Sequence, residues 1–476
     1  MLDKPIKSIS LRQIYTLLFL LGWFFFPFND FEGIPALGEF KNEAGAFFFM
    51  AGLLVLAIEI FFTWKVVLPL RSKPFLILVL FIAWCFVVTV LNYATVSQNY
   101  YKHTSGIYRF IRQYASLLIP SFLFLIFFLN VIKNWSAIEM LTKIRKVLLF
   151  SLIFVFIYGF IETLIIVFNV NALRPVLALF GYFPFVEVNY MTGGRISSVA
   201  YESPSLGNYL ITISGWMFSY ILSSKSRYRF IPLLLILFLT FFSGSRTALI
   251  NITVQVTILL SILYAIPSYR KNFLKIFKFG FIAISILLII NGNKVVVAVG
   301  EKIESLNFSK NLKNNISNQT RFGMQYASLQ VFKENPIIGV GFGQETYHKR
   351  FHYPRWAKKN NWEFEGMYQN NKLRSFPSAY NIYTRLLAET GIIGFSIFVF
   401  LIYYCIKQSI YVFKKSSDQY RILGFVLILS FVGLSLNWLQ TDFFRQHGFW
   451  LCLAILITIL NRISYNNNHS ETHLYN

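Results

Sequence analysis

Long apolar stretches dominate this chain, and short basic clusters separate many of them. A run of 18 or more apolar residues indicates a transmembrane helix, because about 20 residues are needed to cross the hydrocarbon core. By this measure the sequence predicts an all-α polytopic membrane protein with about twelve transmembrane helices. The predicted spans cover approximately residues 12–28, 44–63, 74–96, 115–132, 147–168, 207–223, 230–243, 246–265, 277–298, 389–408, 421–440 and 448–462.

The basic clusters predict which side of the membrane each connection occupies. They are Lys65/Arg71/Lys73, Lys133/Lys143/Arg145/Lys146, Lys225/Arg227/Arg229, Arg270/Lys271/Lys275/Lys278 and Lys414/Lys415/Arg421. Short cytoplasmic loops carry an excess of Lys and Arg. When the spans are threaded with both termini in the cytoplasm, every cluster falls on the cytoplasmic side. The polar residues 466–476 then form a cytoplasmic tail.

The same threading predicts two sizeable segments on the outer face. Residues 169–206 lie within the first part of the chain (1–298), and residues 299–388 form the largest loop, before the last three spans in residues 389–465. A loop of this length without secondary structure is uncommon, so we expect short helices inside it, one of them over residues 314–334. Residues 301–390 carry 13 Lys and Arg residues but only 7 Glu residues. Long outer loops escape the bias against basic residues, and an anionic ligand is the economical reason to keep such charge.

Composition excludes several other classes of protein. Hydrophobic residues make up 56% of the chain and charged residues 13%, which no soluble domain of 476 residues shows. The net charge of +24 does not indicate a nucleic-acid partner, because much of it lies in clusters that the topology explains. Cys85, Cys405 and Cys452 lie inside apolar spans, so neither a disulfide framework nor a zinc site is predicted.

Arg246 is the first candidate for chemistry. It ends the sequence Ser-Gly-Ser-Arg (243–246), which joins two apolar spans at the outer face. Charge at that depth is costly and usually functional, and the guanidinium group matches the geometry of phosphate oxygens. The alternative is an arginine that extends to the lipid headgroups.

Arg195 and Glu202 lie in the outer segment 169–206, close enough in sequence to share one cleft. Glu202 is the best-placed carboxylate to accept a proton from a hydroxyl group, the usual task of a general base. A salt bridge between the two residues, bracing the loop, is the alternative.

Two further sets of residues admit both a functional and a structural interpretation. Arg109 and Arg112 are three residues apart, so on a helix they face the same way, toward lipid phosphates or a substrate diphosphate. His348 and His352 have the i, i+4 spacing of metal ligands on a helix. Neighbouring Lys349, Arg350 and Arg355 would repel a cation, so no metal site is predicted there.

Four sequence elements together carry a resemblance. They occur in the order Arg-Ile-Ser-Ser-Val-Ala-Tyr-Glu-Ser-Pro-Ser-Leu-Gly-Asn-Tyr-Leu (195–210), Ser-Gly-Ser-Arg-Thr-Ala (243–248), Asn-Pro-Ile-Ile-Gly-Val-Gly-Phe-Gly (335–343) and Asn-Ile-Tyr-Thr-Arg-Leu-Leu-Ala-Glu-Thr-Gly-Ile-Ile-Gly (381–394). In combination they resemble the O-antigen ligase and polymerase superfamily of bacterial inner-membrane glycosyltransferases. The resemblance covers mainly residues 190–400.

The resemblance implies transfer of a glycan from an undecaprenyl-diphosphate carrier at the periplasmic face, without a metal or other cofactor. Arg246 and Arg321 match family arginines that hold the diphosphate, and Arg195 matches a third. Many members, ligases especially, have a His directly before the Asn of the last element, where this chain has Tyr380. This departure favours the polymerase branch. Membrane lipids, a flippase and a chain-length regulator are the implied partners.

These observations lead to one hypothesis and two alternatives. The hypothesis is an O-antigen or capsule polymerase in which Arg195, Arg246 and Arg321 bind the diphosphate. Glu202 is the expected base, and Tyr380 or His348 is the alternative base. The first alternative is an O-antigen ligase that passes whole glycans to lipid A-core. The second is a flippase for lipid-linked glycans, which would need charges along a central passage and no large outer loop.

Overall fold

The computed structural model describes residues 10–190, 194–271, 273–275, 278, 300, 315–373, 376–416 and 418–472. Within these residues the regular structure is helical apart from one two-stranded hairpin, β1 (Tyr100–Tyr101) with β2 (Thr104–Ser105). Seven of the described helices are long and apolar enough to cross a membrane, and Leu11–Phe24 and His447–Ile463 are shorter apolar helices. The predicted all-α polytopic membrane fold is therefore confirmed.

Each predicted span outside 277–298 contains a helix, whereas residues 277–298 fall almost wholly outside the described residues. The longer helices are α1 (Leu11–Phe24), α2 (Ala44–Thr63), α3 (Lys73–Leu91), α5 (Gly106–Leu118), α6 (Phe124–Ile132), α7 (Ala137–Ile166), α9 (Ser203–Ser223), α10 (Ile231–Ser243), α11 (Arg246–Ala265), α14 (Ile316–Glu334), α17 (Ile382–Lys415), α18 (Asp418–Asn437) and α19 (His447–Thr472). The short ones used below are η1 (Pro35–Phe40), α4 (Tyr93–Gln98), α8 (Arg174–Ala178), η4 (Leu179–Tyr182), α15 (Glu345–Lys349), α16 (Arg355–Lys358) and η7 (Glu363–Tyr368). Helix α14 corresponds to the helix expected over residues 314–334, with its first helical residue at Ile316 and with residue 314 outside the described residues.

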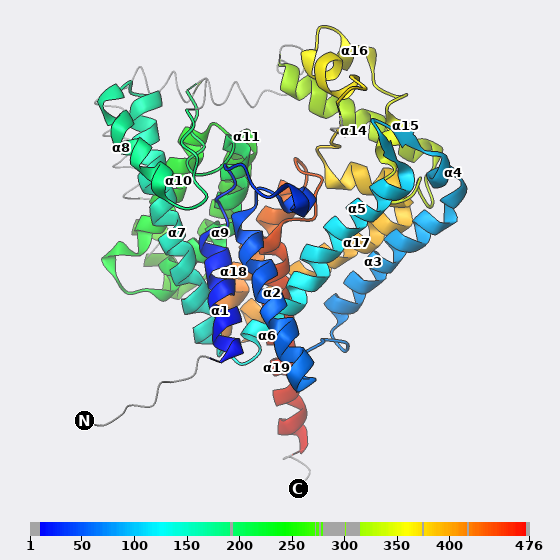
Figure 1. The fold of residues 1–476 in the computed structure, drawn as a ribbon. Helices are drawn as coiled ribbons and strands as arrows, with labels where there is room; N and C mark the ends of the chain where they lie inside the picture. The colour runs from blue at the N-terminus through cyan, green and yellow to red at the C-terminus, as the bar shows by residue number, and fades with distance from the viewer. Residues whose placement is uncertain are drawn as a thin grey trace, which may run out of the picture.

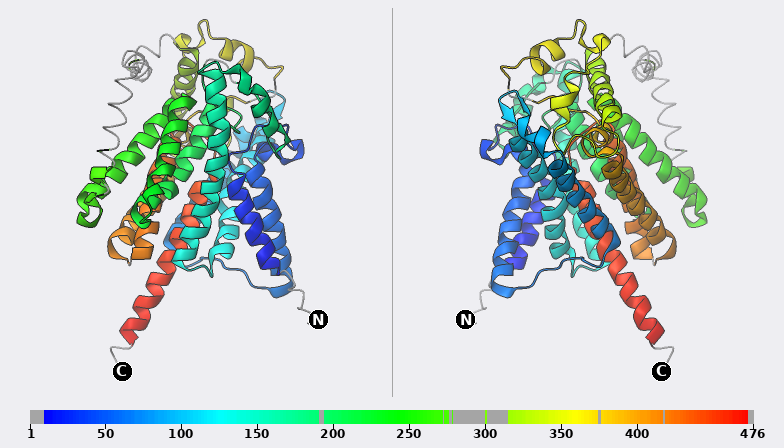
Figure 2. Two further views of the ribbon diagram at one scale, coloured as in Figure 1. Left: turned by 90° about the vertical axis from the view of Figure 1, so that its left-hand side faces the viewer. Right: turned by 90° about the vertical axis from the view of Figure 1, so that its right-hand side faces the viewer.

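The helices are arranged as a bundle with a cap at one end. Helix α18 packs against α9, α11, α17 and α19, which places it near the centre of the bundle. Figure 1 shows α14, α15 and α16 at the end of the molecule opposite the two chain termini. The side views in Figure 2 show the connection between α2 and α3, residues 64–72, at the same end as the termini. The basic residues Lys65 and Arg71 therefore lie at the end remote from the cap.

Helix α5 begins earlier than the predicted span at 115–132. The Ser105 side chain accepts a hydrogen bond from the Tyr108 backbone N–H, which caps the helix at Gly106. Helix α5 then continues through a π-helical turn at Ile119–Leu123 into α6. Arg109 and Arg112 consequently lie on this helix, three residues apart. The first turns of α5 are too polar to be recognised as part of an apolar run. The predicted span therefore starts later than the helix.

The glycine-rich segment 335–343 packs directly on the kinked part of α17. The Val340 N–H donates to Ala388 O and the Gly341 N–H to Glu389 O, both at 3.0 Å, and the Ile392 N–H donates to Pro336 O at 2.9 Å. Gly391 has a positive φ of 63° within α17, at the point where the helix kinks. Two of the sequence elements therefore form one structural unit that holds the cap on the bundle.

Replacing Gly391 with Ala should destabilise the protein. A Cβ atom there would lie 2.1 Å from the Ile337 carbonyl oxygen, and the left-handed conformation adds to the cost of this collision. We expect a lower melting temperature and a smaller fraction of monodisperse protein in detergent. Gly366→Ala is the matched control, because nothing lies within 4 Å of a Cβ placed there. Equal melting of the two variants would contradict this account of the kink.

Candidate functional site

Three arginines from separate elements line one cavity of about 330 Å³ near the cap. Arg195 precedes α9, Arg246 is the first residue of α11, and Arg321 lies on α14. Arg195 and Arg321 are close enough to Arg246 for their charges to act on its guanidinium group. Within the described part of the chain, none of the three forms an ion pair with a carboxylate. The cavity therefore concentrates uncompensated positive charge, which suits an anion with several oxygens.

A buried carboxylate anchors the segment that carries Arg195. Glu162 on α7 accepts hydrogen bonds from the backbone N–H groups of Ser197 and Ser198, at 3.2 and 2.8 Å. Glu162 therefore serves as a structural acid whose carboxylate is satisfied by hydrogen bonds. Gly244 leaves room for the arginine, because a Cβ there would lie 3.0–3.2 Å from the Arg195 side chain. The Ser-Gly-Ser-Arg turn thus positions Arg195 as well as Arg246.

A helix end positions Arg246, and two side-chain contacts position Arg321. The Ser245 side chain accepts a hydrogen bond from the Ala248 N–H and so fixes the start of α11 at Arg246. A helix N-terminus favours negative charge nearby, which adds to the attraction of the guanidinium groups for an anion. The Arg321 guanidinium lies 5.5 Å from the ring centroid of Tyr380, and its Nη1 donates to Gln440 Oε1 at 3.4 Å.

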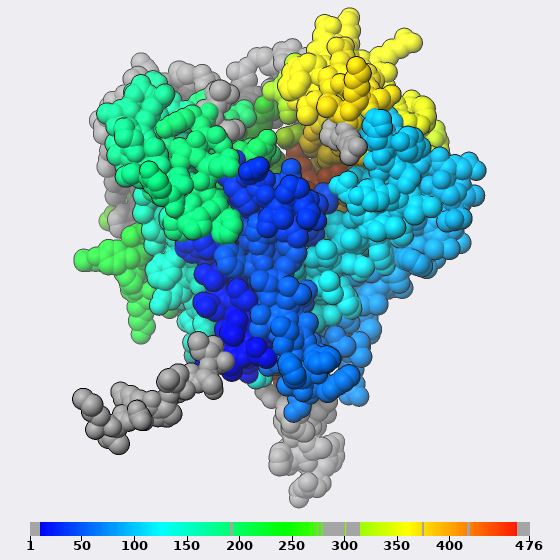
Figure 3. Space-filling view, in the orientation of Figure 1, coloured from blue at the N-terminus to red at the C-terminus, as the bar shows by residue number. Residues whose placement is uncertain are grey.

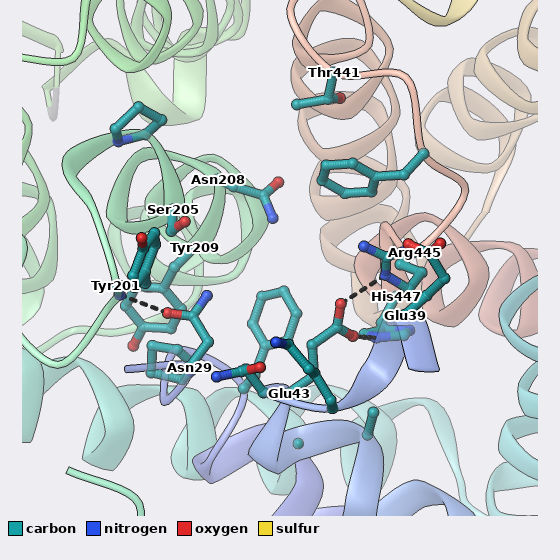
Figure 4. Close-up of a pocket in the computed structure, with 18 of the residues that line it drawn as sticks. Asn29, Glu39, Glu43, Tyr201, Ser205, Asn208, Tyr209, Thr441, Arg445 and His447 are labelled. Atoms are coloured by element: carbon teal, nitrogen blue, oxygen red, sulfur yellow. Dashed lines mark hydrogen bonds and ion pairs between the residues drawn. The ribbon is translucent and has the colours of Figure 1, made fainter. Parts of the chain in front are cut away.

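A larger cavity of about 650 Å³ adjoins the arginine cavity, and the two share Pro204, Asn208 and Thr441 as lining residues. Its walls come from residues 26–46, the start of α9 and residues 441–447. Figure 3 shows the molecule hollowed between the N-terminal segment and the cap. Figure 4 shows Asn29, Tyr201 and Ser205 on one side of this cavity and Arg445 and His447 on the other.

Glu202 lines the larger cavity at the beginning of α9. Its side chain makes no capping hydrogen bond, and no ion pair joins it to Arg195 in the described structure. Burial raises the pKa of the Glu202 carboxyl above its usual value, and the charge of Arg321 partly opposes that shift. A carboxylate with a raised pKa is a stronger base than an ordinary glutamate, so this group is suited to accept a proton.

Tyr380 lies beside the arginine cavity, but it is poorly suited to act as a base. Its hydroxyl group forms a hydrogen bond with the hydroxyl of Tyr368. Burial, together with this neighbour, raises the pKa of the Tyr380 phenol far above its usual value. The phenol therefore stays protonated at neutral pH, and what it can offer is a hydrogen-bond donor and a ring beneath Arg321.

The remaining predicted residues lie apart from the three arginines. Arg112 pairs with Glu39 at 2.6 Å, and the Arg109 guanidinium lies 4.5 Å from the ring centroid of Phe376. Both line a third cavity of about 280 Å³, which also contains Arg385. His348 on α15 lines none of these three cavities.

The environment of His348 favours the neutral imidazole. Burial is the main cause of its lowered pKa, and the charge of Glu334 opposes the shift. A neutral imidazole could accept a proton, but His348 does not line the cavity that holds the three arginines. The structure thus does not bring His348 to the candidate site.

Sequence reasoning missed a charged network in the wall of the larger cavity. Arg445 Nε pairs with Glu43 at 2.7 Å and its Nη1 with Glu39 at 3.2 Å, while His447 Nε2 contacts Glu43 at 3.0 Å. These residues are about 400 positions apart in sequence, so no local spacing indicates the contact. A usable signal was present, because residues 441–447 hold an arginine and a histidine between two apolar spans.

Comparison with known proteins finds a family similarity in part of the chain. Residues 231–399 match the family model described as O-antigen ligase. The matched segment includes Arg246 and Arg321, whereas Arg195 and Glu202 precede it. Among curated proteins, none matches the chain significantly.

Proposed function

We propose, from the match of residues 231–399 to the O-antigen ligase family model, that the protein is a polymerase of the O-antigen ligase and polymerase superfamily. The protein would be a membrane glycosyltransferase that joins undecaprenyl-diphosphate-linked oligosaccharide repeat units into a surface polysaccharide. One observation carries the proposal: three arginines from distant parts of the chain line one cavity, and no carboxylate pairs with them in the described structure. A lipid-borne diphosphate is the anion that this family and this geometry share.

In the proposed reaction the arginines hold the diphosphate of the growing chain. A hydroxyl oxygen of the incoming repeat unit attacks the anomeric carbon attached to the diphosphate. The bond between that carbon and the diphosphate oxygen breaks, its electron pair stays on the diphosphate, and undecaprenyl diphosphate leaves. The hydroxyl proton passes to the Glu202 carboxylate. The three guanidinium groups stabilise the charge that develops on the leaving group, since preorganised donors are most effective where charge appears.

The orientation in the membrane is part of the same proposal. We place the cap and the arginine cavity on the periplasmic side of a bacterial inner membrane, with both termini in the cytoplasm. The structure supports this choice because both termini and the 64–72 connection, with Lys65 and Arg71, lie at the end opposite the cap. Positive charge on connections favours the cytoplasmic side.

Ligation to lipid A-core is the nearest competing reaction, and one feature weighs against it. The position before Asn381, where many ligases of this family have a histidine, is occupied by Tyr380, whose phenol stays protonated. Tyr380 therefore cannot supply the base that a histidine would.

Deletion of the gene should distinguish the two reactions. Loss of a polymerase leaves single repeat units on the lipid A-core, whereas loss of a ligase leaves a bare core, and gel electrophoresis of the lipopolysaccharide separates these products. We expect single repeat units. Purified protein should also lengthen lipid-linked repeat units in detergent without an energy source. If it does not, while vesicles containing it translocate such lipids, the protein is a flippase and the proposal is wrong.

A further inference from the structure

The larger cavity has a charge balance that differs from that of the arginine cavity. Three basic and three acidic side chains line it, apart from His447: those of Lys41, Arg112, Arg445, Glu39, Glu43 and Glu202. Several are already paired, since Arg445 contacts both Glu39 and Glu43 and Arg112 contacts Glu39. An anionic group would therefore be drawn to the arginine cavity and not to this one.

The uncharged lining of the larger cavity suits a ligand rich in hydroxyl groups. Amide and hydroxyl side chains that both donate and accept hydrogen bonds surround it: those of Asn29, Asn42, Asn208, Tyr201, Ser205 and Thr441. Phe26, Phe443 and the ring of Tyr201 add apolar faces. Tyr201 is 64% exposed, so its ring has a free face. Convergent polar groups beside aromatic faces, in a cavity of this volume, are typical of a small-ligand site.

The two cavities meet at Asn208. Its Oδ1 accepts a hydrogen bond from Asn437 Nδ2 at 2.8 Å, which fixes the side chain where it lines both spaces. Glu202 lines the larger cavity, and the charge of Arg321, which lines the smaller one, acts on its carboxyl group. A hydroxyl group held in the larger cavity near Asn208 would therefore lie close to the arginine cavity. A sugar attached to a diphosphate in the arginine cavity would begin at the same place.

From this arrangement we propose that the larger cavity is the binding site for the acceptor saccharide. It would take the non-reducing end of an oligosaccharide and present a hydroxyl group to Glu202, with the Tyr201 ring against the sugar. The inference rests on the proposed function and extends it, because it assigns the second substrate to residues that lie outside the matched family segment.

The opposite wall is built to keep its shape when the saccharide binds. Arg112 on α5, Glu39 on η1, Glu43 before α2, Arg445 and His447 form one connected set of contacts between 2.6 and 3.2 Å. These contacts tie helices from the two ends of the sequence together. A wall whose hydrogen bonds are already made loses little conformational entropy on binding.

Binding of a diphosphate-free saccharide tests the inference. The probe is the oligosaccharide released by mild acid from the host's own undecaprenyl-diphosphate-linked repeat unit. Its binding to the purified full chain is measured by saturation-transfer NMR, and that of undecaprenyl diphosphate in a parallel titration. Tyr201→Ala should weaken saccharide binding about tenfold, because it removes one aromatic face, and leave the diphosphate lipid unaffected. Tyr201→Phe should retain most of the affinity.

Tyr182→Ala is the matched control, because Tyr182 is 90% exposed on η4 and lines none of the three cavities. It should bind both probes like the wild-type protein. Three results would overturn the inference: no saccharide binding by the wild-type protein, unchanged binding by Tyr201→Ala, or loss of both ligands in that variant. Arg246→Ala distinguishes failure of this inference from failure of the proposed function. That variant should no longer bind the diphosphate lipid but should still bind the saccharide.

Discussion

Replacement of Arg246 with Ala is expected to lower polymer formation by about 10²- to 10³-fold, the usual loss when one preorganised donor to a developing charge is removed. Arg246, at the start of α11, lines the same cavity as Arg195 and Arg321 and lies close enough to both to feel their charge. In the proposed site its loss removes both a unit charge and a fork of donors from the diphosphate. The measurement is the chain-length distribution of polymer made by purified protein, normalised to the amount of protein.

Two variants make this test specific. Arg246→Lys keeps the charge but loses the planar fork, so its activity should fall between those of the wild-type protein and the Ala variant. Arg174→Ala is the control, because Arg174 on α8 contacts the ring of Tyr190 and lines none of the three cavities. Polymer of normal length and amount from Arg246→Ala, at normal protein level, would rule out the diphosphate site.

Glu202→Gln should have an effect of similar size, about 10²- to 10⁴-fold on the rate, because the amide cannot accept the acceptor's proton. The substitution preserves shape and removes only the base. Binding of undecaprenyl diphosphate should therefore remain, which separates this variant from Arg246→Ala. Glu365→Gln, an exposed carboxylate on η7, is the matched control.

The dependence of the rate on pH provides a second measurement of the same residue. In the proposed reaction the active form of Glu202 is the carboxylate, so the wild-type rate should fall as pH is lowered through the pKa of Glu202. Since burial raises that pKa, the fall should begin at a higher pH than for an ordinary glutamate. Arg321 lowers the pKa, so Arg321→Ala should move the acidic limb of the residual activity to still higher pH. An acidic limb that persists unchanged in Glu202→Gln would show that another group is the base.

The membrane helices were predictable from the order of apolar and polar residues, because the bilayer imposes a minimum apolar length on each span. A helix lies at every predicted span outside residues 277–298, and seven of the described helices are long and apolar enough to cross a membrane. The boundaries were less predictable where a helix begins with polar turns that contact protein instead of lipid. Helix α5 starts nine residues before the predicted span for this reason.

The choice of individual site residues depended on information that spacing does not contain. Arg195, Arg246 and Arg321 share a cavity because Glu162 anchors one segment, a serine caps another and α14 brings Arg321 to the same space. Arg112, equally basic in sequence, is neutralised by Glu39.

The sequence was thus sufficient for the class of fold and for the arginines worth testing, because burial in lipid and the chemistry of the guanidinium group are properties of local composition. The tertiary structure alone decided which cations stay unpaired. That outcome depends on carboxylates such as Glu39 and Glu43, which reach Arg445 across nearly the whole length of the chain. Electrostatic attraction acts through distance in space, and only the packing of the helices sets those distances.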